Sequence, residues 1–381
     1  MDEGLVLAGL MSGTSCDGID CALLRYAPGA RPELLAYRET PMPEALREPI
    51  LRLCAPGVDE IELMGEVHVA LGEAYAEAVR ALEEEAGVRA DVIGMHGQTI
   101  RHRPRARWPF TWQIGSAAVV AERTGRTVVY DFRSRDIAAG GEGAPLAPLM
   151  HRVLFGERDA DVAVVNVGGI ANITWLGKDG RTFGFDAGPG NLVMDRLVNV
   201  LTDGRERMDR DGMLAAMGRA SEAHVQDALR HPFFARRPPK SADRGDFEPM
   251  AEALLRAPDL ADADRVATAL EITARAIADA QRFLPRAPAR WIVCGGGARN
   301  PALMRRLQAL VQGEVCTSKD LGFPPEAIEA CAFAVFALHA LVRLPTSLAA
   351  ATGARADASG GAIVPGDNWK ALIARILPWI R

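Results

Sequence analysis

Apolar runs interrupted by glycine-rich turns organise both halves of the chain. Residues 5–11 form a continuous apolar run, a polar stretch follows at 12–18, and a second apolar run covers 19–24. Two apolar runs around Gly, Ser and Asp are typical of a β-hairpin, here with an unusually polar tip. The same layout returns at 161–176 with little sequence identity. The pattern therefore predicts a structural repeat and an α/β fold of two related lobes with a central cleft.

Helical and strand patterns fill the rest of the chain. Outside the hairpins we expect helices or strands at 60–87, 91–95, 128–130, 264–284, 291–294 and 324–342. The first of these predicts a helix that ends at Gly87, a residue type common just after helix ends. The glycine-rich stretch 131–148 predicts a polar loop. We expect an N-terminal lobe over 1–160 and a C-terminal lobe over 161–381.

Composition narrows the class of protein. The chain has 381 residues, 49 % of them hydrophobic, with 44 Lys+Arg against 49 Asp+Glu and a net charge of −5. This length suits about two domains, and the mild acidity argues against a dedicated nucleic-acid binder. No apolar run approaches the roughly 20 residues of a membrane span, and the acidic N-terminus lacks a secretory signal, so we expect a cytoplasmic protein. None of the six cysteines forms a CxxC pair, which argues against a disulfide framework or structural zinc.

Three glycine-rich turns, at 13–18, 168–169 and 295–297, each follow a predicted strand. Glycine lets backbone N–H groups approach an anion closely, and Thr14 and Ser15 add hydroxyl donors. One such turn alone is as often a simple tight turn, but three together favour a nucleotide site. The chain has no GxxxxGK[ST] motif, and Asn300 breaks a GxGxxG pattern. Neither a P-loop NTPase nor a simple Rossmann dehydrogenase is therefore indicated.

Several carboxylates could carry chemistry. Asp186, in FGFDAGPGN, follows an apolar strand at a Gly-Pro-Gly turn, where it could act as a general base or simply cap a turn. Asp17 and Asp20 flank a glycine in the first hairpin. One of these two could hold Mg²⁺ through water, or make an ordinary turn contact.

Hydrogen-bond donors gather in two segments between the hairpins. Gln98 and Thr99 lie in HGQTIRHRP and could donate to sugar hydroxyls. The two histidines of that segment are six residues apart, which is not a metal-ligand spacing. Arg133 and Arg135, in DFRSRD, are bidentate donors suited to a carboxylate ligand, unless they are surface charges or pair with neighbouring aspartates.

These segments together resemble one known family, that of anhydro-N-acetylmuramic acid kinase. The blocks that carry the resemblance are LMSGTSCDGID, GMHGQTIRHRP, DFRSRDIAAGGEGAPLAP, NVGGIANIT, GFDAGPGN, CGGGARNPALM and GFPPEAIEACAFA, followed by LPTSLAAATGARADASGGAIVPG. They run in the family's order over nearly the whole chain. The resemblance implies the actin/hexokinase/Hsp70-type ATPase fold and a homodimer.

The resemblance also implies an activity. The family uses ATP, Mg²⁺ and water to open the 1,6-anhydro ring of 1,6-anhydro-N-acetylmuramic acid and to phosphorylate O6. The product is N-acetylmuramic acid 6-phosphate, an intermediate of amino sugar catabolism in peptidoglycan recycling. Asp186 would match the catalytic aspartate that deprotonates a water attacking C1, and Glu329 would help to position that water.

The remaining site residues follow from the same blocks. The resemblance implies ATP binding by Gly13, Thr14, Ser15, Cys16, Asp17, Gly18, Ile19 and Asp20, by Gly168 and Gly169, and by Gly295, Gly296, Gly297 and Asn300, and sugar binding by Gln98, Thr99, Arg133 and Arg135. One block departs from the family, which has a Lys-Ser-Thr-Gly-Arg-Glu-like stretch. In PPKSADRGDF, Ala242 and Asp243 replace Thr and Gly, which affects the expectation for lobe closure and leaves the reaction class unchanged.

Three other interpretations remain at this point. A related kinase could act on another anhydrosugar such as levoglucosan, and its sugar pocket would lack an arginine for the lactyl carboxylate. A catalytically silent ATP-binding sensor could share the fold, although the presence of Asp186 and Glu329 argues against it. A glycosidase would use two carboxylates but would leave the three phosphate-type turns without a purpose.

Overall fold

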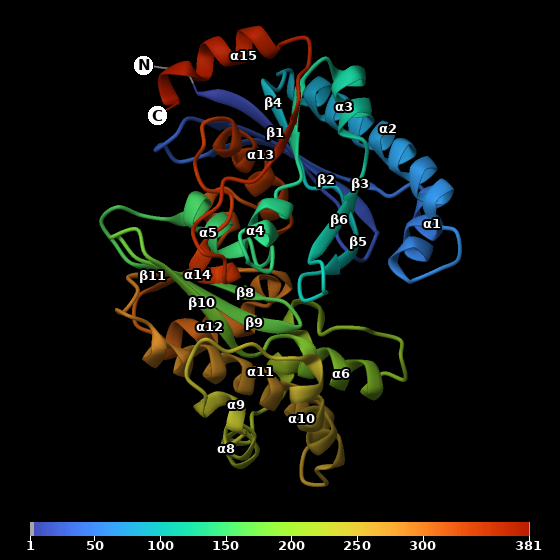
Figure 1. The fold of residues 1–381 in the computed structure, drawn as a ribbon. Coiled ribbons are helices and arrows are strands. Elements are labelled where there is room, and N and C mark those ends of the chain that lie inside the picture. The colour runs from blue at the N-terminus through green and yellow to red at the C-terminus, as the bar shows by residue number, and fades with distance from the viewer. Residues whose placement is uncertain (1–3, 381) are drawn as a thin grey trace. The chain divides into compact units, whose positions relative to one another are not determined.

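The computed structural model describes residues 4–380, which group into two compact units, each built around its own β-sheet (Figure 1). Unit 1 comprises the described residues of Met1–Leu154 together with Gly322–Arg381, and unit 2 comprises Phe155–Leu321. The expected boundary at residue 160 lies close to the first division. The structure differs from the expected division at 322–381, which belongs to unit 1.

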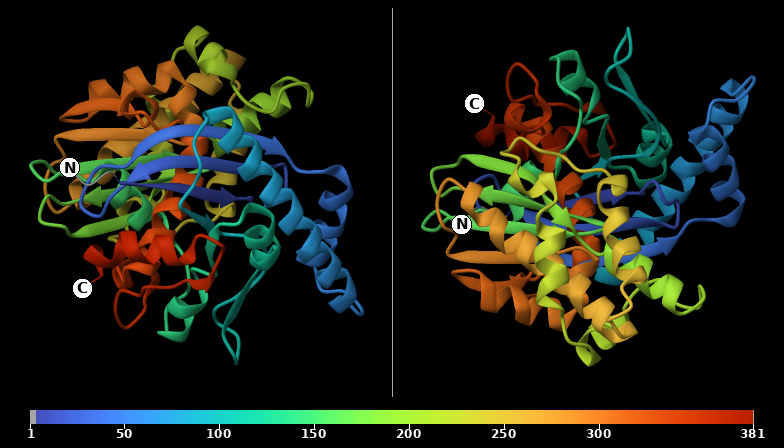
Figure 2. Two further views of the ribbon diagram at one scale, coloured as in Figure 1. Left: turned by 90° about the horizontal axis from the view of Figure 1, so that it is seen from above. Right: turned by 90° about the horizontal axis from the view of Figure 1, so that it is seen from below.

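The sheet of unit 1 has the strand order β13-β7-β4-β1-β2-β3. Its strands are β1 (Leu5–Met11), β2 (Gly18–Tyr26), β3 (Glu33–Pro41), β4 (Val92–Met95), β7 (Thr127–Tyr130) and β13 (Ala362–Val364). The antiparallel strands β1, β2 and β3 lie side by side (Figure 2), and β4 and β7 continue the sheet parallel to β1. A separate two-stranded ribbon pairs β5 (Gln98–Arg103) with β6 (Phe110–Ile114).

The helices around this sheet are α1 (Glu44–Cys54), α2 (Ile61–Ala86), α3 (Ala117–Thr124), α4 (Ser134–Ala138), α5 (Ala147–Phe155), α13 (Ile328–Leu341), α14 (Ala349–Thr352) and α15 (Trp369–Ile376), with short 3₁₀ turns η5 (Pro325–Ala327) and η6 (Leu377–Trp379). Of these, α2 and α13 pack on opposite faces of the sheet. Helix α2 packs on the face that carries Ala8 and Leu10, in one apolar cluster with residues of β2. Gly9 alternates with these residues along β1, so it faces the opposite side, where α13 lies.

Two glycines explain why α13 joins unit 1. A Cβ on Gly9 would lie 1.8 Å from the carbonyl oxygen of Ala330, and one on Gly94 would lie 1.9 Å from that of Phe333. The backbone of α13 therefore rests directly on β1 and β4, which only glycine permits. The apolar pattern of 324–342 predicts a helix, but it does not say which of two sheets that helix covers.

The sheet of unit 2 has the order β10-β9-β8-β11-β12. Its strands are β8 (Val162–Val167), β9 (Ile170–Leu176), β10 (Thr182–Pro189), β11 (Arg290–Cys294) and β12 (Glu314–Thr317). Three antiparallel strands, β8 to β10, are followed by β11 and β12 running parallel to β8. Unit 1 has the same arrangement in β1 to β3, β4 and β7, so the predicted structural repeat is confirmed.

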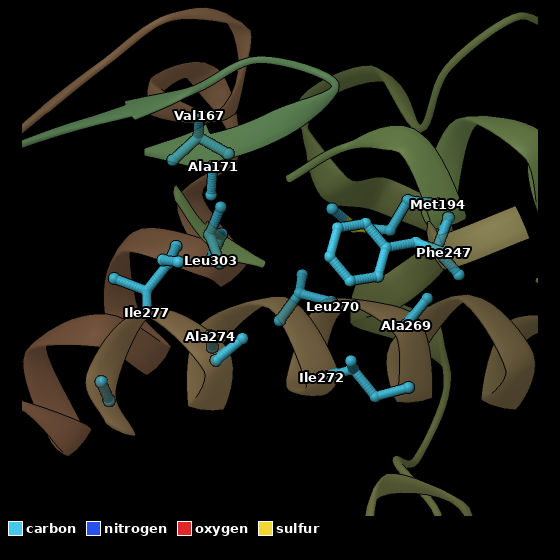
Figure 3. Close-up of a cluster of buried hydrophobic side chains, with 14 of the residues drawn as sticks. Val167, Ala171, Met194, Phe247, Ala269, Leu270, Ile272, Ala274, Ile277 and Leu303 are labelled. Atoms are coloured by element: carbon cyan, nitrogen blue, oxygen red, sulfur yellow. The ribbon is translucent and has the colours of Figure 1, made fainter. Parts of the chain in front are cut away.

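The core of unit 2 centres on one long helix, α11. The helices are α6 (Leu192–Leu201), α7 (Met213–Met217), α8 (Glu222–Leu229), α9 (Pro232–Ala235), α10 (Arg244–Arg256), α11 (Asp262–Asp279) and α12 (Pro301–Leu310), with 3₁₀ turns η1 (Arg210–Gly212), η2 (Ala280–Phe283), η3 (Gly296–Arg299) and η4 (Lys319–Leu321). Leu270 and Ile277 of α11 share an apolar cluster with Val167 of β8 and with Phe247 of α10 (Figure 3). This cluster holds the sheet and its covering helices in one body.

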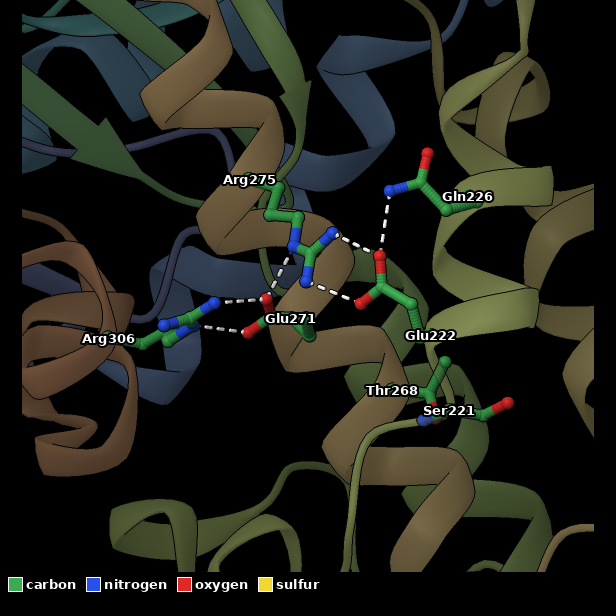
Figure 4. Close-up of polar contacts among 7 residues, drawn as sticks. All are labelled: Ser221, Glu222, Gln226, Thr268, Glu271, Arg275 and Arg306. Atoms are coloured by element: carbon green, nitrogen blue, oxygen red, sulfur yellow. Dashed lines mark hydrogen bonds and ion pairs between the residues drawn. The ribbon is translucent and has the colours of Figure 1, made fainter. Parts of the chain in front are cut away.

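A polar network ties the helices of unit 2 together where α11 meets α8 and α12 (Figure 4). Arg275 donates to Glu222 of α8 and to Glu271 one turn earlier on α11. Glu271 also accepts two hydrogen bonds from Arg306 of α12. Hydrogen bonds from Arg275 lower the pKa of Glu222 to about 2. The network keeps both glutamates ionised and is structural.

Most of the predicted elements are confirmed, with two local differences. The helix predicted at 60–87 is α2, and Gly87 follows it with a left-handed φ of 66°. The stretch 131–148, expected as a loop, contains α4 and the start of α5. Asp186 lies inside β10, beside a bulge between Asp186 and Gly188, and does not follow the strand as expected. Among residues 4–380, the search for a helix long and apolar enough to cross a membrane finds none.

Candidate functional site

The turn between β1 and β2 presents hydroxyl and backbone groups at the surface of unit 1. Thr14, Ser15 and Asp17 are exposed, whereas Ser12 and Cys16 are buried. Cys16 has a φ of +55°, an uncommon conformation for a residue with a side chain. Its N–H donates to the carbonyl of Gly13 at 3.1 Å. The turn is therefore tightly closed, with Thr14 and Ser15 projecting from it.

Gln98, which the sequence places in the sugar site, also supports this turn. Its side chain is fully buried, and its Nε2 donates to the carbonyl oxygen of Gly13 at 3.1 Å. Ser12 is held in turn by the hydroxyl of Tyr75 at 2.5 Å. The Oε1 atom of Gln98 is buried and has no hydrogen-bond partner among the residues that the structure describes. A donor on a ligand or a water would satisfy this oxygen, since buried acceptors are rarely left unpaired.

The side chains of the first hairpin divide between core and surface. Cys16 and Ile19 belong to the apolar core of unit 1, so only their backbone groups are open to a nucleotide. Asp17 forms an ion pair with Arg47 at 3.6 Å. Asp20 accepts a hydrogen bond from the hydroxyl of Tyr37 at 2.5 Å, and burial raises its pKa.

A metal in this region would have to rely on single carboxylates. Residues 4–380 contain no group of three or more His, Cys, Asp or Glu side chains that could hold an ion. Asp17 and Asp20 each offer one carboxylate. Mg²⁺ commonly keeps several waters and takes one or two carboxylates together with substrate phosphates, so these residues fit Mg²⁺ bound with a nucleotide.

The half-buried Arg133 pairs with the buried His96 near Glu329. Arg133 donates through Nε to Nε2 of His96 at 2.9 Å and through Nη1 to the carbonyl of Gly143 at 2.8 Å. The Nδ1 of His96 lies 2.7 Å from the carbonyl of Gly97, an acceptor, so Nδ1 carries the proton and Nε2 is free to accept. Burial and Arg133 lower the pKa of His96 to about 3, which keeps the ring neutral. The ring thereby fixes the direction of the Arg133 guanidinium.

Glu329 lies in the first turn of α13, within the electrostatic reach of Arg133. Desolvation by the surrounding protein raises the pKa of Glu329, although solvent reaches the side chain, and the charge of Arg133 opposes that rise. Thr99, also expected in the sugar site, is half-buried, and its hydroxyl accepts from Gln113 at 3.1 Å. The structure thus places Arg133 with Glu329, and Thr99 on the β5–β6 ribbon.

Arg135 does not join Arg133. The two residues are two positions apart at the start of α4, so their side chains leave on different sides of the helix. Arg135 is exposed and lines a surface pocket of about 510 Å³ with Arg343 and Arg355. Arg135 thus lines this surface pocket, whereas Arg133 lies within the electrostatic reach of Glu329.

The turn between β8 and β9 in unit 2 consists of Gly168 and Gly169. The N–H groups of residues 190–192 donate to their carbonyls at 2.7–3.1 Å. A Cβ on Gly190 would lie only 2.2 Å from the carbonyl oxygen of Gly168, whereas one on Gly168 would meet nothing closer than 3.7 Å. This turn is therefore held by close backbone packing.

The third glycine turn packs against the second. A Cβ on Gly295, which has a φ of +74°, would lie 2.4 Å from Oδ1 of Asn166. One on Gly297 would lie 2.3 Å from the side chain of Val167, so neither position accepts another residue. A Cβ on Gly296 would lie 3.4 Å from Nδ2 of Asn191. The glycine turns of unit 2 thus form one continuous backbone surface.

Asn300 has a structural use of its own. Its Oδ1 accepts from the N–H groups of Ala302 and Leu303 at 3.0 and 3.1 Å and so caps α12. The side chain is nearly buried. Asn300 is expected to bind ATP, and the cap leaves only its remaining amide atoms for that purpose.

Asp186 is held by the segment that departs from the family pattern. Its backbone N–H donates to the carbonyl of Lys240 at 3.1 Å, and its Oδ2 accepts from the N–H of Ala242 at 2.9 Å. Its Oδ1 has no hydrogen bond within residues 4–380. Burial raises the pKa of Asp186, while the N–H of Ala242 and the charge of Lys240 lower it. The replacement of Thr by Ala at position 242 leaves this contact intact because the donor is the backbone.

Three charged residues near these turns have no role in the sequence analysis. Lys240 is buried beside Asp186. Arg244, at the start of α10, has Nη2 3.9 Å from the position of a Cβ on Gly169. Asp195 of α6 has its pKa raised to about 6 by burial, opposed by Arg244. The sequence could have indicated Lys240 and Arg244, because both match the Lys-Ser-Thr-Gly-Arg-Glu-like stretch of the family. Nothing in the local sequence indicates Asp195.

Two α/β units, each with a glycine-containing hairpin beside parallel strands, agree with the two-lobed α/β fold that the sequence resemblance implies. The sequence profile described as anhydro-N-acetylmuramic acid kinase matches residues 5–366, so the chain belongs to that family.

Curated relatives agree over almost the whole chain. A protein of Xanthomonas oryzae pv. oryzae named anhydro-N-acetylmuramic acid kinase is 43 % identical over 377 residues, covering 95 % of this chain and 98 % of its own. Proteins of the same name from Cupriavidus pinatubonensis and Shewanella amazonensis are 45 % and 41 % identical, covering 94 % and 96 % of this chain and 97 % and 100 % of their own.

Solved structures give more distant similarities. The activator of the 2-hydroxyisocaproyl-CoA dehydratase from Clostridium difficile with bound ADPNP has a TM-score of 0.44 at 12 % identity, covering 87 % of this chain and 94 % of that one. The ROK hexokinase from Thermus thermophilus has a TM-score of 0.36 at 18 % identity, covering 86 % and 98 %.

Proposed function

We propose that this chain carries out the reaction of its family: ATP-dependent hydrolytic opening of 1,6-anhydro-N-acetylmuramic acid with phosphorylation of O6. The product is N-acetylmuramic acid 6-phosphate, and the reaction belongs to the recycling of cell-wall sugars. Family membership over residues 5–366 supports this activity. The observation that carries the residue-level proposal is the carboxylate of Asp186, fixed through Oδ2 and open at Oδ1.

Asp186 acts as the general base. Its Oδ1 takes a proton from water, and the water oxygen bonds to C1 of the sugar while the C1–O6 bond breaks. O6 then bonds to the γ-phosphorus as the bond between that phosphorus and its bridging oxygen breaks, which releases ADP. The anchored Oδ2 supports this role, because a base whose rotamer is fixed needs little reorganisation to reach the water.

Glu329 and Arg133 handle the sugar side of the reaction. Glu329 positions the water, and its raised pKa comes from desolvation that Arg133 partly offsets. Arg133 keeps N–H groups beyond those used by His96 and Gly143, since a guanidinium has five. We assign these groups to Glu329 and to the lactyl carboxylate of the sugar.

The glycine turns bind the nucleotide. The backbone of Gly13–Asp20, with the hydroxyls of Thr14 and Ser15, contacts the phosphates, as does the Gly168–Gly169 turn, and Gly295–Gly297 lies against adenosine. Phosphoryl transfer requires mainly positioning and neutralisation of charge, which backbone N–H groups provide. Mg²⁺ held by Asp17 or Asp20 through water would supply further neutralisation of the phosphates.

The assembly and location follow the family expectation. We propose a homodimer that works in the cytoplasm, where ATP is available. Light scattering coupled to size exclusion measures the mass directly. A mass of about twice 40.9 kDa is expected, and a single-chain mass would contradict the dimer.

The decisive experiment is a mass-resolved turnover assay in ¹⁸O-labelled water. The purified chain is incubated with ATP, Mg²⁺ and 1,6-anhydro-N-acetylmuramic acid, with levoglucosan and N-acetylmuramic acid in parallel. We expect a product that gains one water and one phosphate, with one ¹⁸O at C1, from the first substrate only. Turnover of levoglucosan alone would change the substrate and keep the mechanism, and no turnover of any sugar would contradict the proposed activity.

A pair of matched variants tests the base. Asp186→Asn is expected to lower kcat by about 10³-fold or more, because water is no longer deprotonated, while the Kd for ATP stays within about threefold. Asp227→Asn makes the same change at an exposed carboxylate of unit 2 and is expected to behave like the wild type. Retained turnover in Asp186→Asn would contradict the role of Asp186.

A further inference from the structure

Lys240 is a buried cation in an aromatic pocket. Its side chain is only 5 % exposed. The Nζ atom lies 4.4 Å from the ring centre of Phe233, 5.1 Å from that of Phe283 and 5.8 Å from that of Phe185. Its one hydrogen bond among the described residues runs to the carbonyl of Phe233 at 3.3 Å. Ring faces attract a cation, so this pocket offsets part of the cost of removing the ammonium from water.

No carboxylate neutralises this ammonium by direct contact. Within residues 4–380, Lys240 has no ion pair, yet its charge lowers the pKa of Asp186. A buried charge without a paired partner is costly, and most buried lysines are paired. The arrangement therefore costs stability that an apolar residue in the same aromatic pocket would not.

The backbone of Lys240 also contacts Asp186 directly. The carbonyl of Lys240 accepts from the N–H of Asp186, and two residues later the N–H of Ala242 donates to Oδ2 of Asp186. The Lys240 side chain in its aromatic pocket and the two hydrogen bonds thus hold the same short segment, residues 240–242. Phe185, which precedes Asp186 on β10, contributes one of the rings of this aromatic pocket.

We propose that Lys240 is a positioning residue for Asp186. Its ammonium, held in the aromatic pocket, anchors segment 240–242 against β10. The same positive charge keeps the Asp186 carboxylate ionised and leaves Oδ1 free. This inference rests on the proposed function of Asp186 as the base. It assigns the segment in which this chain departs from its family to the support of that base.

Five charged groups determine the pH range in which Lys240 can support Asp186. Burial, together with the charges of Arg282 and Arg236, lowers the pKa of Lys240 to about 8, and the charge of Asp186 opposes this change. Arg282 and Arg236 pack on the rings of Phe283 and Phe233. Asp243 raises the pKa of Asp186. Activity therefore needs Asp186 deprotonated and Lys240 protonated, so it falls below the pKa of Asp186 and falls again above about pH 8.

The test compares Lys240→Met, which fills the pocket without a charge, with the wild type from pH 4.5 to pH 9.5. We expect kcat to fall about tenfold or more, and the acid limb of kcat/KM to move up by roughly half a unit to one unit because Asp186 loses its cation. The alkaline limb near pH 8 should disappear, and the KM for ATP should stay within twofold. Lys178→Met, the same change at an exposed site of unit 2, should leave both limbs in place.

Two further variants keep the test decisive. Lys240→Gln replaces Lys240→Met if the latter does not fold, and the same shift is expected. Lys240→Arg retains a cation and should keep the acid limb at the wild-type pH even where kcat falls. Unmoved limbs in a folded Met or Gln variant, with kcat changed only in proportion to the active fraction, would show a purely structural lysine and overturn the proposal. Turnover in Asp186→Asn would instead overturn the proposed base.

Discussion

The two hairpin turns occupy equivalent places in their sheets but are built by different means. In unit 1, the six residues from Ser12 to Asp17 are supported by side chains from distant elements, Gln98 and Tyr75. In unit 2, the Gly168–Gly169 turn is supported by hydrogen bonds from backbone N–H groups and by close packing against Gly190. A Cβ on Gly190 would lie only 2.2 Å from the carbonyl oxygen of Gly168. One repeat thus relies on polar side chains and the other on the absence of side chains.

The difference indicates how each site fails. A turn held by hydrogen bonds loses a fraction of its affinity when one bond is removed, since a typical hydrogen bond contributes about 1 kcal/mol. A turn held by backbone close packing has no room to relax, so a single methyl group displaces it. Damage in unit 1 should therefore be graded, and damage in unit 2 should be abrupt.

The largest effect is expected from Gly190→Ala. Its Cβ would lie 2.2 Å from the carbonyl oxygen of Gly168, which forces the second turn apart. We expect a loss of about 3 kcal/mol in the stability of unit 2, a melting temperature lower by about 6–12 °C, and no measurable ATP binding. Calorimetry and nucleotide titration measure both.

Gly168→Ala is the matched control for that change. Its Cβ would meet only Ile170 at 3.7 Å, an ordinary contact, so stability should change by less than about 0.5 kcal/mol. Equal damage from both substitutions would show that the second turn is not limited by close packing.

The next effect separates the two arginines of α4. Arg133→Ala should lower kcat/KM for the sugar by about 10²-fold, because it removes the cation beside Glu329 and leaves Nε2 of His96 unpaired. Arg135→Ala should stay within about twofold, since Arg135 lies on a different surface. Steady-state kinetics on both variants decide the point, and equal losses would support the place of Arg135 in the sugar site that the sequence predicts.

A smaller effect is expected from Gln98→Leu in the first turn. Without the amide, the carbonyl of Gly13 loses its donor, and the KM for ATP should rise about tenfold with little change in melting temperature. Gln113→Leu, on the paired strand β6, serves as the control, because this amide donates to Thr99 and Thr111 and to no other of the described residues. A rise in the KM for the sugar alone would support the sugar contact that the sequence predicts for Gln98.

The smallest effect concerns Asp195, a carboxylate beside the glycine-built site. Its pKa of about 6 lies above the ordinary 3.8, so the protonated form favours folding, and that contribution is lost as the pH rises through 6. Asp195→Asn should therefore raise stability by about 1 kcal/mol at pH 7, discounted for partial exposure, and by much less at pH 4. Thermal melts at the two pH values measure the difference, and an equal gain at both would contradict the linkage.

Local patterns in the sequence were sufficient for most elements and for the family. The apolar run at 5–11 matches β1, and Gly87 ends α2, because strands and helix ends depend on neighbouring residues. The signature blocks indicate which segments carry the glycine turns. The repeat of the hairpins, although nearly without sequence identity, follows from the same apolar–glycine–apolar order.

The remaining features depend on contacts between residues far apart in the sequence. Gln98 meets Gly13 across 85 positions, which no local pattern indicates, so its support of the first turn could not be predicted. The pairing of Asp186 with segment 240–242 likewise depends on the path of the chain through α6 to α9, which lie between them in the sequence. The separation of Arg133 from Arg135 depends on helix α4 at 134–138. The sequence did not indicate this helix, because the glycines of the surrounding stretch favour a loop.

The return of α13 to the first sheet also bears on how the chain is made. Unit 2 is one uninterrupted stretch, so all of its residues have been synthesised before Gly322 is added. Unit 1 needs α13 to cover Gly9 and Gly94, and the 167 residues of unit 2 come between. At the usual speed of translation, one face of the first sheet stays uncovered for roughly 10–30 seconds on the ribosome. The second unit is therefore the one able to finish folding first, and the first unit is the one exposed to chaperones during synthesis.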